Sequence, residues 1–191
     1  MRPAIRFALL FSGAWIALKL ILLSLDLFQE DVVKPGLINN LFLLLAISLG
    51  LYFEKKKEGF GIGSPLSDIK RALSAGAPYV LIVSVFMYFY YDRINPSFIE
   101  NRVTERMDII YSEMESEAYL DTLRAHNSEF RVMTREEITR DIKADTESAL
   151  SAQTLFVFSL LGLMVMALTY SIFITIIFRK ILLRDYYQKQ E

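Results

Sequence analysis

The fold of this chain is decided by residues 92–150, which read DRINPSFIENRVTERMDIIYSEMESEAYLDTLRAHNSEFRVMTREEITRDIKADTESAL. This polar stretch lies between two hydrophobic segments. It carries 14 acidic and 8 basic side chains, which gives it a net charge of −6. Because charged side chains are costly in hydrocarbon, the stretch must lie outside a membrane that the flanking segments cross. The remaining question is which side of that membrane it occupies.

The composition of the chain is typical of an integral membrane protein. The chain has 191 residues, 53% of them hydrophobic, and its mean hydropathy is +0.33. The apolar residues are gathered in blocks, as membrane spans require. A net charge of −1 argues against a nucleic-acid partner. The chain has no cysteine, which excludes disulfides and thiol chemistry, and nothing in the composition indicates a cofactor.

Four segments are apolar and long enough to be transmembrane helices, at about residues 7–28, 37–53, 66–91 and 154–178. The first resembles a signal peptide, but its length and the lack of a small-residue cleavage site favour a retained span. We therefore predict an all-α fold in three parts. Residues 1–91 hold three spans, residues 92–150 form a polar helical hairpin, and residues 151–191 hold the fourth span and a basic tail.

The short segments that flank the spans differ in charge. The connection after the first span has only Lys34 against Glu30 and Asp31. The positive-inside rule then places both termini in the cytoplasm and residues 92–150 outside it, because long segments count little in the rule. The segments on the cytoplasmic side are basic and contain Arg2, Arg6, Lys55, Lys56, Lys57, Lys70, Arg71, Arg179, Lys180, Arg184 and Lys189.

The connection between the second and third spans reads EKKKEGFGIG at residues 54–63. Its alternating glycines are similar to a phosphate-binding loop, but no Lys-Ser/Thr follows and no strand precedes them, so a flexible turn is favoured. Lys55, Lys56 and Lys57 are expected to face anionic headgroups. Ser64 and Pro65 predict the start of the next helix, with Ser64 as its N-cap.

The polar stretch begins where the third span leaves the membrane, directly after the aromatic residues 88–91. Asp92, Arg93, Asn95 and Pro96 are predicted to mark the outer interface. Residues 97–100 read SFIE, which predicts a capping box and a helix to about residue 124. One face of this helix carries an apolar stripe, which is our candidate surface for binding a protein partner. The stripe is formed by Ile99, Val103, Met107, Ile110 and Met114.

A second capping box, Thr134 with Glu137, predicts a second helix of the polar stretch. No proline or glycine separates it from Gly162, so we expect it to continue unbroken into the fourth span. The two helices of the polar stretch should be antiparallel neighbours. So few residues cannot form a large core, so their stripes must pack on each other or on another protein.

Lys19 is the only full charge well inside a span. An intramembrane lysine is a functional candidate by default, and snorkelling to the headgroups is the structural alternative. Helical side chains lean toward the N-terminus, which here directs Lys19 toward the middle of the bilayer. Both readings stay open. Asn39 and Asn40 open the second span near the outer surface, where capping is expected rather than ligand binding.

Few residues in the chain suggest catalysis or metal binding. His126 is the single histidine and lies in a polar loop. The acidic residues between 113 and 121 lack the spacing of a calcium loop and are expected to be solvated, so no metal site is predicted. Sequence motifs of hydrolases and metalloproteases are missing, which leaves only carboxylates such as Asp26 and Asp92 for an enzyme.

The chain resembles a bacterial family of four-span membrane proteins catalogued as a domain of unknown function. The resemblance rests on the glycine-bearing loop and entry helix at residues 61–76, the aromatic exit at residues 88–91, and the NPSFIE sequence at residues 95–100. A charged helical hairpin and a final span that ends in Arg179-Lys180 complete it. The resemblance implies a protein of the bacterial inner membrane without known activity, and an accessory role beside membrane glycosyltransferases.

Three function classes follow from these features. The first is a non-enzymatic accessory or scaffolding subunit that binds a membrane or extracytoplasmic protein, such as a membrane glycosyltransferase, or a second copy of itself. The second is a small transporter or lipid-handling protein in which Lys19 recognises an anionic group. The third is an enzyme. Membrane lipids are expected partners in every case, and nucleic acid in none.

Overall fold

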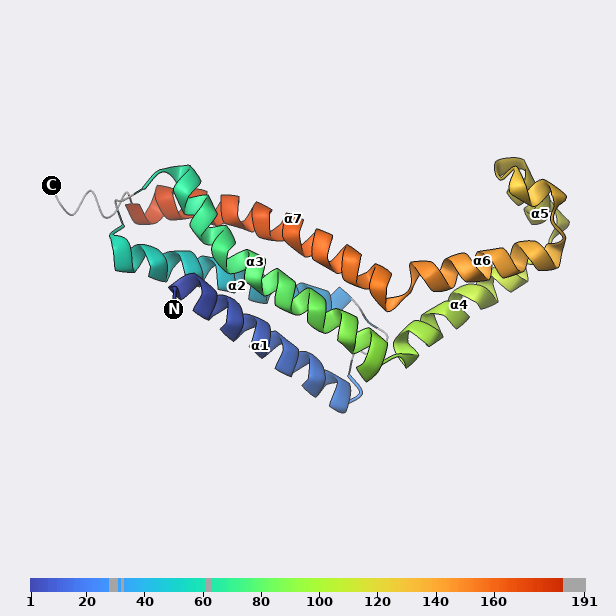
Figure 1. Cartoon of the computed structure of the whole chain (residues 1–191), viewed down its shortest axis with the longest axis horizontal. Coiled ribbons are helices and arrows are strands. Elements are labelled where there is room, and N and C mark those ends of the chain that lie inside the picture. Colours follow the sequence, from blue (N-terminus) through green and yellow to red (C-terminus); the bar gives the residue numbers. More distant parts are fainter. Residues whose placement is uncertain (28–30, 32, 61–62, 184–191) are drawn as a thin grey trace. The chain divides into compact units, whose positions relative to one another are not determined.

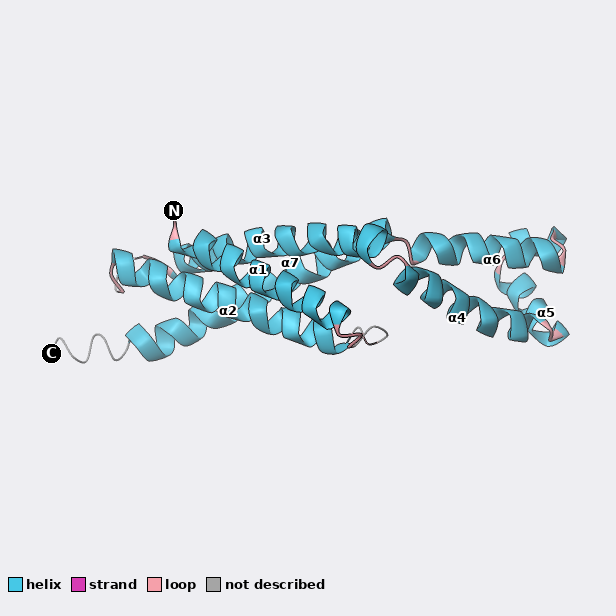
Figure 2. Cartoon of the chain, turned by 90° about the horizontal axis from the view of Figure 1, so that it is seen from below, coloured by secondary structure: helices cyan, strands magenta, loops and turns pink. Residues whose placement is uncertain are grey.

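The computed structural model describes residues 1–27, 31, 33–60 and 63–183. The described residues are helical or lie in connections, and no strand occurs among them, so the predicted all-α fold class is confirmed (Figure 2). The α-helices are α1 (Pro3–Ser24), α2 (Val33–Glu58), α3 (Pro65–Phe89), α4 (Ser97–Met114), α5 (Glu117–His126), α6 (Arg135–Ala149) and α7 (Ala152–Phe178). Three short helices accompany them: η1 (Tyr90–Ile94), η2 (Glu129–Val132) and η3 (Arg179–Leu183).

The chain divides into two compact units. Unit 1 comprises Met1–Phe86 and Val157–Glu191, and unit 2 comprises Met87–Phe156. Unit 1 therefore holds α1, α2, most of α3 and most of α7. Unit 2 holds the end of α3, the polar helices and the first turn of α7, so it contains the ends of two spans as well as the polar stretch.

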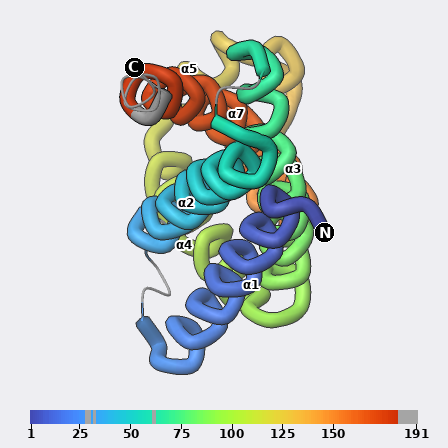
Figure 3. Tube along the Cα trace, turned by 90° about the vertical axis from the view of Figure 1, so that its left-hand side faces the viewer, coloured from blue at the N-terminus to red at the C-terminus, as the bar shows by residue number. Residues whose placement is uncertain are grey.

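Four helical segments are long and apolar enough to cross a membrane: Pro3–Ser24, Val33–Glu58, Pro65–Ile94 and Ala152–Ile181. A helix pairs its own backbone groups, which hydrocarbon requires of any spanning segment. In unit 1 the start of α1, the end of α2, the start of α3 and the end of α7 lie at the same end (Figure 1). The helices can be followed from that end in Figure 3. The segments of α2 and α3 are more buried than those of α1 and α7, so α2 and α3 form the centre of unit 1.

Small residues allow the helices of unit 1 to approach closely. A Cβ atom on Gly50 of α2 would lie 2.8 Å from Cβ of Ala75 and 3.3 Å from Cα of Ala4. A Cβ on Gly76 of α3 would lie 3.1 Å from Cβ of Ala167 on α7. Close approach at small residues is a usual means of association for membrane helices, because apolar burial gives no preference over lipid there.

Unit 2 has a hydrophobic core of its own. It is built by α4, α5, η2 and α6, with partly buried neighbours such as Tyr119 and Ile142 packed around it. The polar helices therefore bury one shared set of apolar side chains within the chain. The buried core residues are Met107, Ile110, Met114, Leu120, Phe130 and Ile138.

The structure corrects two helix predictions in unit 2. The helix expected to reach about residue 124 ends at Met114, and α5 begins after Ser116, whose backbone is extended (φ −85°, ψ 122°). This break lets Leu120 turn into the core. The helix expected to run unbroken into the fourth span ends at Ala149. Ser151 then starts α7, because its hydroxyl accepts a hydrogen bond from the backbone N–H of Thr154 at 3.2 Å.

The three predicted helices begin where expected, at Pro65, Ser97 and Arg135, but only two of the three predicted caps are confirmed. Ser64 accepts a hydrogen bond from the backbone N–H of Ser67 at 3.3 Å, and α3 begins at Pro65. Thr134 and Glu137 form the predicted capping box. The capping box predicted at Ser97 is wrong. Pro96 precedes the first residue of α4, and the Ser97 hydroxyl donates to Oδ1 of Asn95 at 2.8 Å instead.

Candidate functional site

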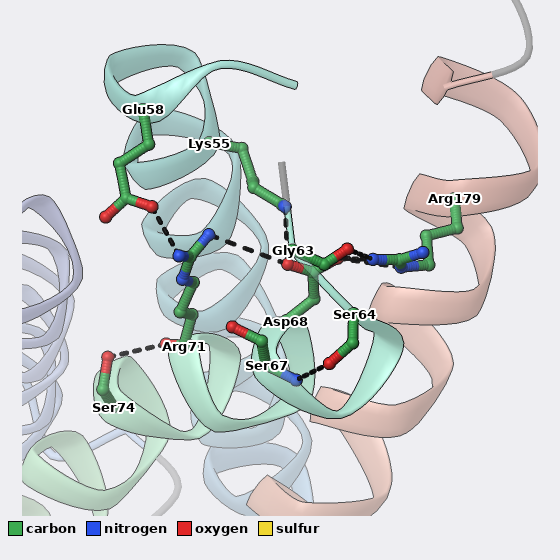
Figure 4. A network of polar contacts seen from close by, with 9 residues as sticks. All are labelled: Lys55, Glu58, Gly63, Ser64, Ser67, Asp68, Arg71, Ser74 and Arg179. Carbon is green, nitrogen blue, oxygen red and sulfur yellow. Dashed lines mark hydrogen bonds and ion pairs between the residues drawn. The ribbon is translucent and has the colours of Figure 1, made fainter. Parts of the chain in front are cut away.

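A buried carboxylate lies at the end of unit 1 where α2 is connected to α3. Asp68, in the first turn of α3, is fully buried, and so is Lys55 in the last turns of α2. The Lys55 Nζ atom lies 2.6 Å from Oδ1 of Asp68. Full burial of both side chains removes their charges from water, so each depends on the other for compensation. Figure 4 shows this pair at the centre of a network of charged side chains.

Arg179, directly after α7, completes the buried part of the network. Its Nε and Nη2 atoms lie 2.8 Å and 2.7 Å from Oδ2 of Asp68, which makes a two-point contact with one oxygen. Its Nη2 atom also donates to the carbonyl oxygen of Gly63 at 2.6 Å. Gly63 has a positive φ of 104°, which a residue with a side chain rarely adopts. One guanidinium thus joins α7 to both α3 and the turn before it.

Arg71 forms the outer edge of the network. Its guanidinium lies 2.5 Å from Oε2 of Glu58 and 3.8 Å from Oδ1 of Asp68. The Arg71 and Glu58 side chains are 22% and 41% exposed, so solvent reaches this contact, whereas Asp68 and Lys55 are both fully buried. Three cations face two anions, and the network as a whole carries one positive charge.

The arrangement is suited to holding helices together rather than to proton transfer. Both oxygens of Asp68 are occupied by cations, and Lys55 has no exposed surface. A general acid or base must reach a substrate atom within hydrogen-bonding distance. A buried, charge-compensated carboxylate does not offer that access. The network instead links α2, α3 and α7, and such buried pairs are best understood as fixing one arrangement of packed elements.

This network was not predicted from the sequence. Lys55 was expected to face lipid headgroups, and that prediction is wrong because Lys55 is buried against Asp68. Lys56 and Lys57 are exposed. One signal was available in the sequence: Asp68, like Glu54 and Glu58, is an acidic residue in a basic flank, and opposite charges there indicate ion pairs.

A second buried polar contact lies inside unit 1. The Tyr79 hydroxyl, on α3, donates to Oδ1 of Asn39 on α2 at 2.6 Å. Both side chains are buried, so Asn39 joins two helices rather than capping one. The Oδ1 atom of the neighbouring Asn40 is also shielded and accepts no hydrogen bond from the described residues. Lys19 lies near the end of α1 and is half-buried.

The predicted outer-interface residues lie together at the end of the third span. Asp92 and Arg93 belong to the short helix η1 and pair with each other at 2.8 Å. Asn95 is buried, and its Nδ2 atom donates to the Tyr90 hydroxyl at 3.5 Å. Pro96 is exposed and precedes α4.

The apolar stripe of α4, which was predicted to bind a partner, is largely buried inside unit 2. Met107, Ile110 and Met114 belong to the core of unit 2, and Val103 packs against that core. Ile99 is half-buried. These side chains are used within the chain, so a change in them would disturb unit 2 itself.

Two cavities open between α4 and α6 of unit 2. The first, of about 430 Å³, is bordered by Arg102, Arg106 and Leu150 among others. The second, of about 540 Å³, is bordered by Tyr111 and by the bases Arg135, Arg140 and Lys143, together with Met114, Glu115, Glu136 and Thr139. Both volumes are in the range of ligand-binding clefts, about 300–1,000 Å³. Within residues 1–27, 31, 33–60 and 63–183, no three histidine, aspartate or glutamate side chains converge to hold a metal ion.

The four apolar helices define the class of this protein, a multi-pass membrane protein of all-α fold. Residues 6–180 match the family described as "Protein of unknown function (DUF4199)", and the chain belongs to that family. The match covers the second and third spans and unit 2 completely, and all but the outermost residues of the first and fourth spans. No curated protein matches the chain, and no solved structure does so either. The description of this family names no activity.

Proposed function

We propose that this protein is a non-enzymatic accessory or scaffolding subunit of the bacterial inner membrane that binds a protein partner through unit 2. The observation that carries this proposal is the second cavity of unit 2, where an exposed tyrosine lies among three bases. The Tyr111 side chain is 47% exposed although it is a large aromatic. Tyrosine and arginine are the residue types enriched where a few side chains supply most of the binding energy of an interface.

The structure of unit 2 supports this role. Its core residues hold α4, α5, η2 and α6 together, so the cavity has fixed walls. The wall on α6 carries Arg135, which pairs with Glu117 of α5 at 2.6 Å. A cleft with walls set before binding loses less freedom on association than a mobile one. Its three bases and two acids favour a partner surface of mixed charge with an acidic excess.

The ion network of unit 1 supports a scaffolding rather than a catalytic role. The charges of Asp68 and Lys55 are compensated by ion pairs within the protein. The network fixes the end of α7 against the start of α3, and the opposite ends of these two helices belong to unit 2. A subunit that presents a binding surface benefits from such fixed supports. The resemblance noted above makes a membrane glycosyltransferase the first candidate partner.

The test is affinity purification of the full chain from native membranes in mild detergent, followed by mass spectrometry. We expect a stoichiometric partner with the wild-type chain and its loss with Tyr111→Ala, since truncating a central interface residue costs about 2 kcal/mol or more, roughly thirtyfold in affinity. Ile109→Ala is the matched control, because Ile109 is on the same helix and is 46% exposed but borders the other cavity. A wild-type chain that elutes alone, or a partner retained by Tyr111→Ala, contradicts the proposal. A second copy of the chain as the co-eluting species would identify a homo-oligomer.

A second function, lipid handling, is favoured by one observation. Lys19 is half-buried within a span, where an ionisable group is expensive and usually functional. In this reading its ammonium recognises an anionic group within the bilayer. Lys19→Met should then abolish lipid transfer between vesicles that contain the protein. Unchanged transfer in this variant would remove the second function.

A further inference from the structure

The break between α6 and α7 is not required by the residues that form it. No proline or glycine occurs between Thr134 and Gly162, and residues 149–153 read ALSAQ. Alanine, leucine and glutamine are good helix formers. The helix α6 nevertheless ends at Ala149, and α7 begins at Ala152, with the break inside unit 2. Side chains rather than backbone preference must therefore hold the two helices apart.

The break is held at one carbonyl group. The carbonyl oxygen of Ser148 accepts hydrogen bonds from the hydroxyls of Ser151 and Thr154, each at 2.8 Å. The Ser151 hydroxyl oxygen also accepts from the backbone N–H of Thr154 at 3.2 Å. In a continuous helix the Ser148 oxygen would instead accept from the N–H of Ala152, four residues further on. The two hydroxyls thus compete with the helix for the same acceptor.

The hydrogen bonds of the two arrangements nearly balance. As the first residues of α7, Ala152 and Gln153 have backbone N–H groups without an acceptor in that helix. A continuous helix would supply acceptors to both groups in exchange for the bonds of the two hydroxyls. Such exchanges change the free energy little, because a hydrogen bond lost to protein is replaced by another partner or by water. The hydroxyl contacts with Ser148 are exposed, so water reaches them.

The buried faces of α6 and α7 are in phase across the break. When their buried residues are placed on one ideal helix of 3.6 residues per turn, they fall within an arc of about 140°. One continuous helix would therefore keep the same face buried. These residues are Ile138, Ala152, Ala167, Ser171, Thr175 and Phe178.

The other connection to the polar helices is also non-helical. Asn95, between η1 and α4, has φ −136° and ψ 64°, and Pro96 lacks the N–H that a continuing helix would need. The contacts across it include a hydrogen bond from Ser97 to Asn95 and the rings of Tyr91 and Phe98. Since α4 and α6 share the core of unit 2, they can turn together at these two connections.

We propose that residues 148–154 form a two-state joint. In the broken form, which the structure shows, the Ser151 and Thr154 hydroxyls hold the Ser148 carbonyl. In the continuous form they release it, and α6 and α7 join as one helix. The joint lies where the fourth span begins, so it links the direction of the polar helices to that span. Leu150 borders the first cavity, so the change also reshapes this cavity. The joint does not depend on the partner proposed for the second cavity.

The first experiment measures hydrogen exchange of the full chain in detergent, by mass spectrometry of peptides that contain residues 152 and 153. Ser151→Ala/Thr154→Val removes both hydroxyls. We expect these amides to exchange about tenfold more slowly, which corresponds to about 1.4 kcal/mol, because the continuous helix now protects them. Hydroxyls that only cap α7 predict the opposite, since a helix without its cap frays. Unchanged or faster exchange overturns the proposal.

A matched control removes two hydroxyls of the same kind from α4. The hydroxyl of Ser112 donates to the carbonyl oxygen of Ile109 at 2.7 Å, and that of Thr104 donates to the carbonyl oxygen of Glu100 at 2.9 Å. Both contacts are exposed and lie within a helix. Ser112→Ala/Thr104→Val should leave exchange at residues 152 and 153 as in the wild type. Equal slowing in both double variants would also contradict the joint.

A distance measurement tests the two forms without removing the hydroxyls. Nitroxide labels on Glu136→Cys and Gln153→Cys, both in unit 2, are 17 residues apart, or about 26 Å in a continuous helix. We expect two distances in the otherwise wild-type chain, one near 26 Å and one shorter. Ala152→Pro should leave only the shorter one, because proline is tolerated at the first position of a helix and not inside one. A single short distance in both chains overturns the proposal.

Discussion

Replacing Asp68 by asparagine should destabilise the membrane unit strongly. The substitution keeps the size of the side chain and removes its charge. Lys55, fully buried and 2.6 Å away, would be left without its anion, and Arg179 would lose a two-point contact of 2.7–2.8 Å. Removing one partner of a buried pair typically costs about 3–5 kcal/mol, because the other charge stays buried and uncompensated.

The assay is thermal unfolding of the full chain in mild detergent, followed by circular dichroism. For a chain of this size about 1 kcal/mol corresponds to roughly 2–4 °C, so the midpoint of Asp68→Asn should fall by roughly 6–20 °C. Glu58→Gln is the matched control, because its contact with Arg71 is solvent-exposed and such pairs contribute about 0–1 kcal/mol.

A double substitution separates the effect of charge from the loss of a side chain. Lys55→Met/Asp68→Leu removes both buried charges together, and replacing a buried pair by apolar residues is often neutral. Its midpoint should return most of the way to that of the wild type, since Arg179 is 26% exposed and keeps the Gly63 carbonyl. The reasoning is refuted if Asp68→Asn loses less than about 1 kcal/mol, or if the double variant is no more stable than Asp68→Asn.

Three other predictions follow from unit 2 and from the proposed orientation. Met107→Ala should destabilise unit 2 by about 2–5 kcal/mol, measured as faster amide exchange in α4 and α6, because a buried core side chain leaves a cavity. Hydrogen bonds from the backbone N–H and side chain of Thr134 hold the pKa of Glu137 below its ordinary value. The Glu137 carboxylate therefore stabilises α6 fully above its pKa in the unfolded chain, and this stabilisation is lost as the pH falls through the lower pKa of the folded protein. Amide exchange at the start of α6 should therefore quicken on acidification in the wild type and not in Glu137→Gln. Since the chain has no cysteine, single substitutions report topology: a membrane-impermeant maleimide should label Ser128→Cys in intact cells and should not label Lys56→Cys.

Each of these predictions has a contradicting result. Unchanged exchange in Met107→Ala would mean that the core of unit 2 is not packed as described. Equal acid sensitivity of the wild type and Glu137→Gln would assign the pH effect to another group. Labelling at position 56 and protection at position 128 would reverse the proposed orientation.

The spans were predictable because their signal is local. A run of apolar residues long enough to cross hydrocarbon defines a helix without reference to the rest of the chain, and all four expected spans appear as helices. The caps at Ser64 and Thr134 are local too, and both were found. The predicted cap at Ser97 failed because Asn95, two residues earlier, competes for the same hydroxyl.

The ion network was not predictable in the same way because its members are far apart in the sequence. Arg179 reaches Asp68 and Gly63 only through the packing of α7 on α3. The sequence shows Lys55 and Arg179 as ordinary basic flanks, and it gives no sign of which base is buried. The break at Ser116 was missed for a related reason. It is favoured because it lets Leu120 become buried in the core of unit 2, and this core exists only in the folded unit.

The central claim is that the Tyr111 cavity of unit 2 binds a protein partner. A photoreactive amino acid placed at position 111 of the full chain, irradiated in native membranes, tests this directly. The account predicts one discrete protein adduct at position 111 and no such adduct when the same amino acid replaces Ile109. The absence of any protein adduct at position 111, or the same adduct from both positions, would contradict it.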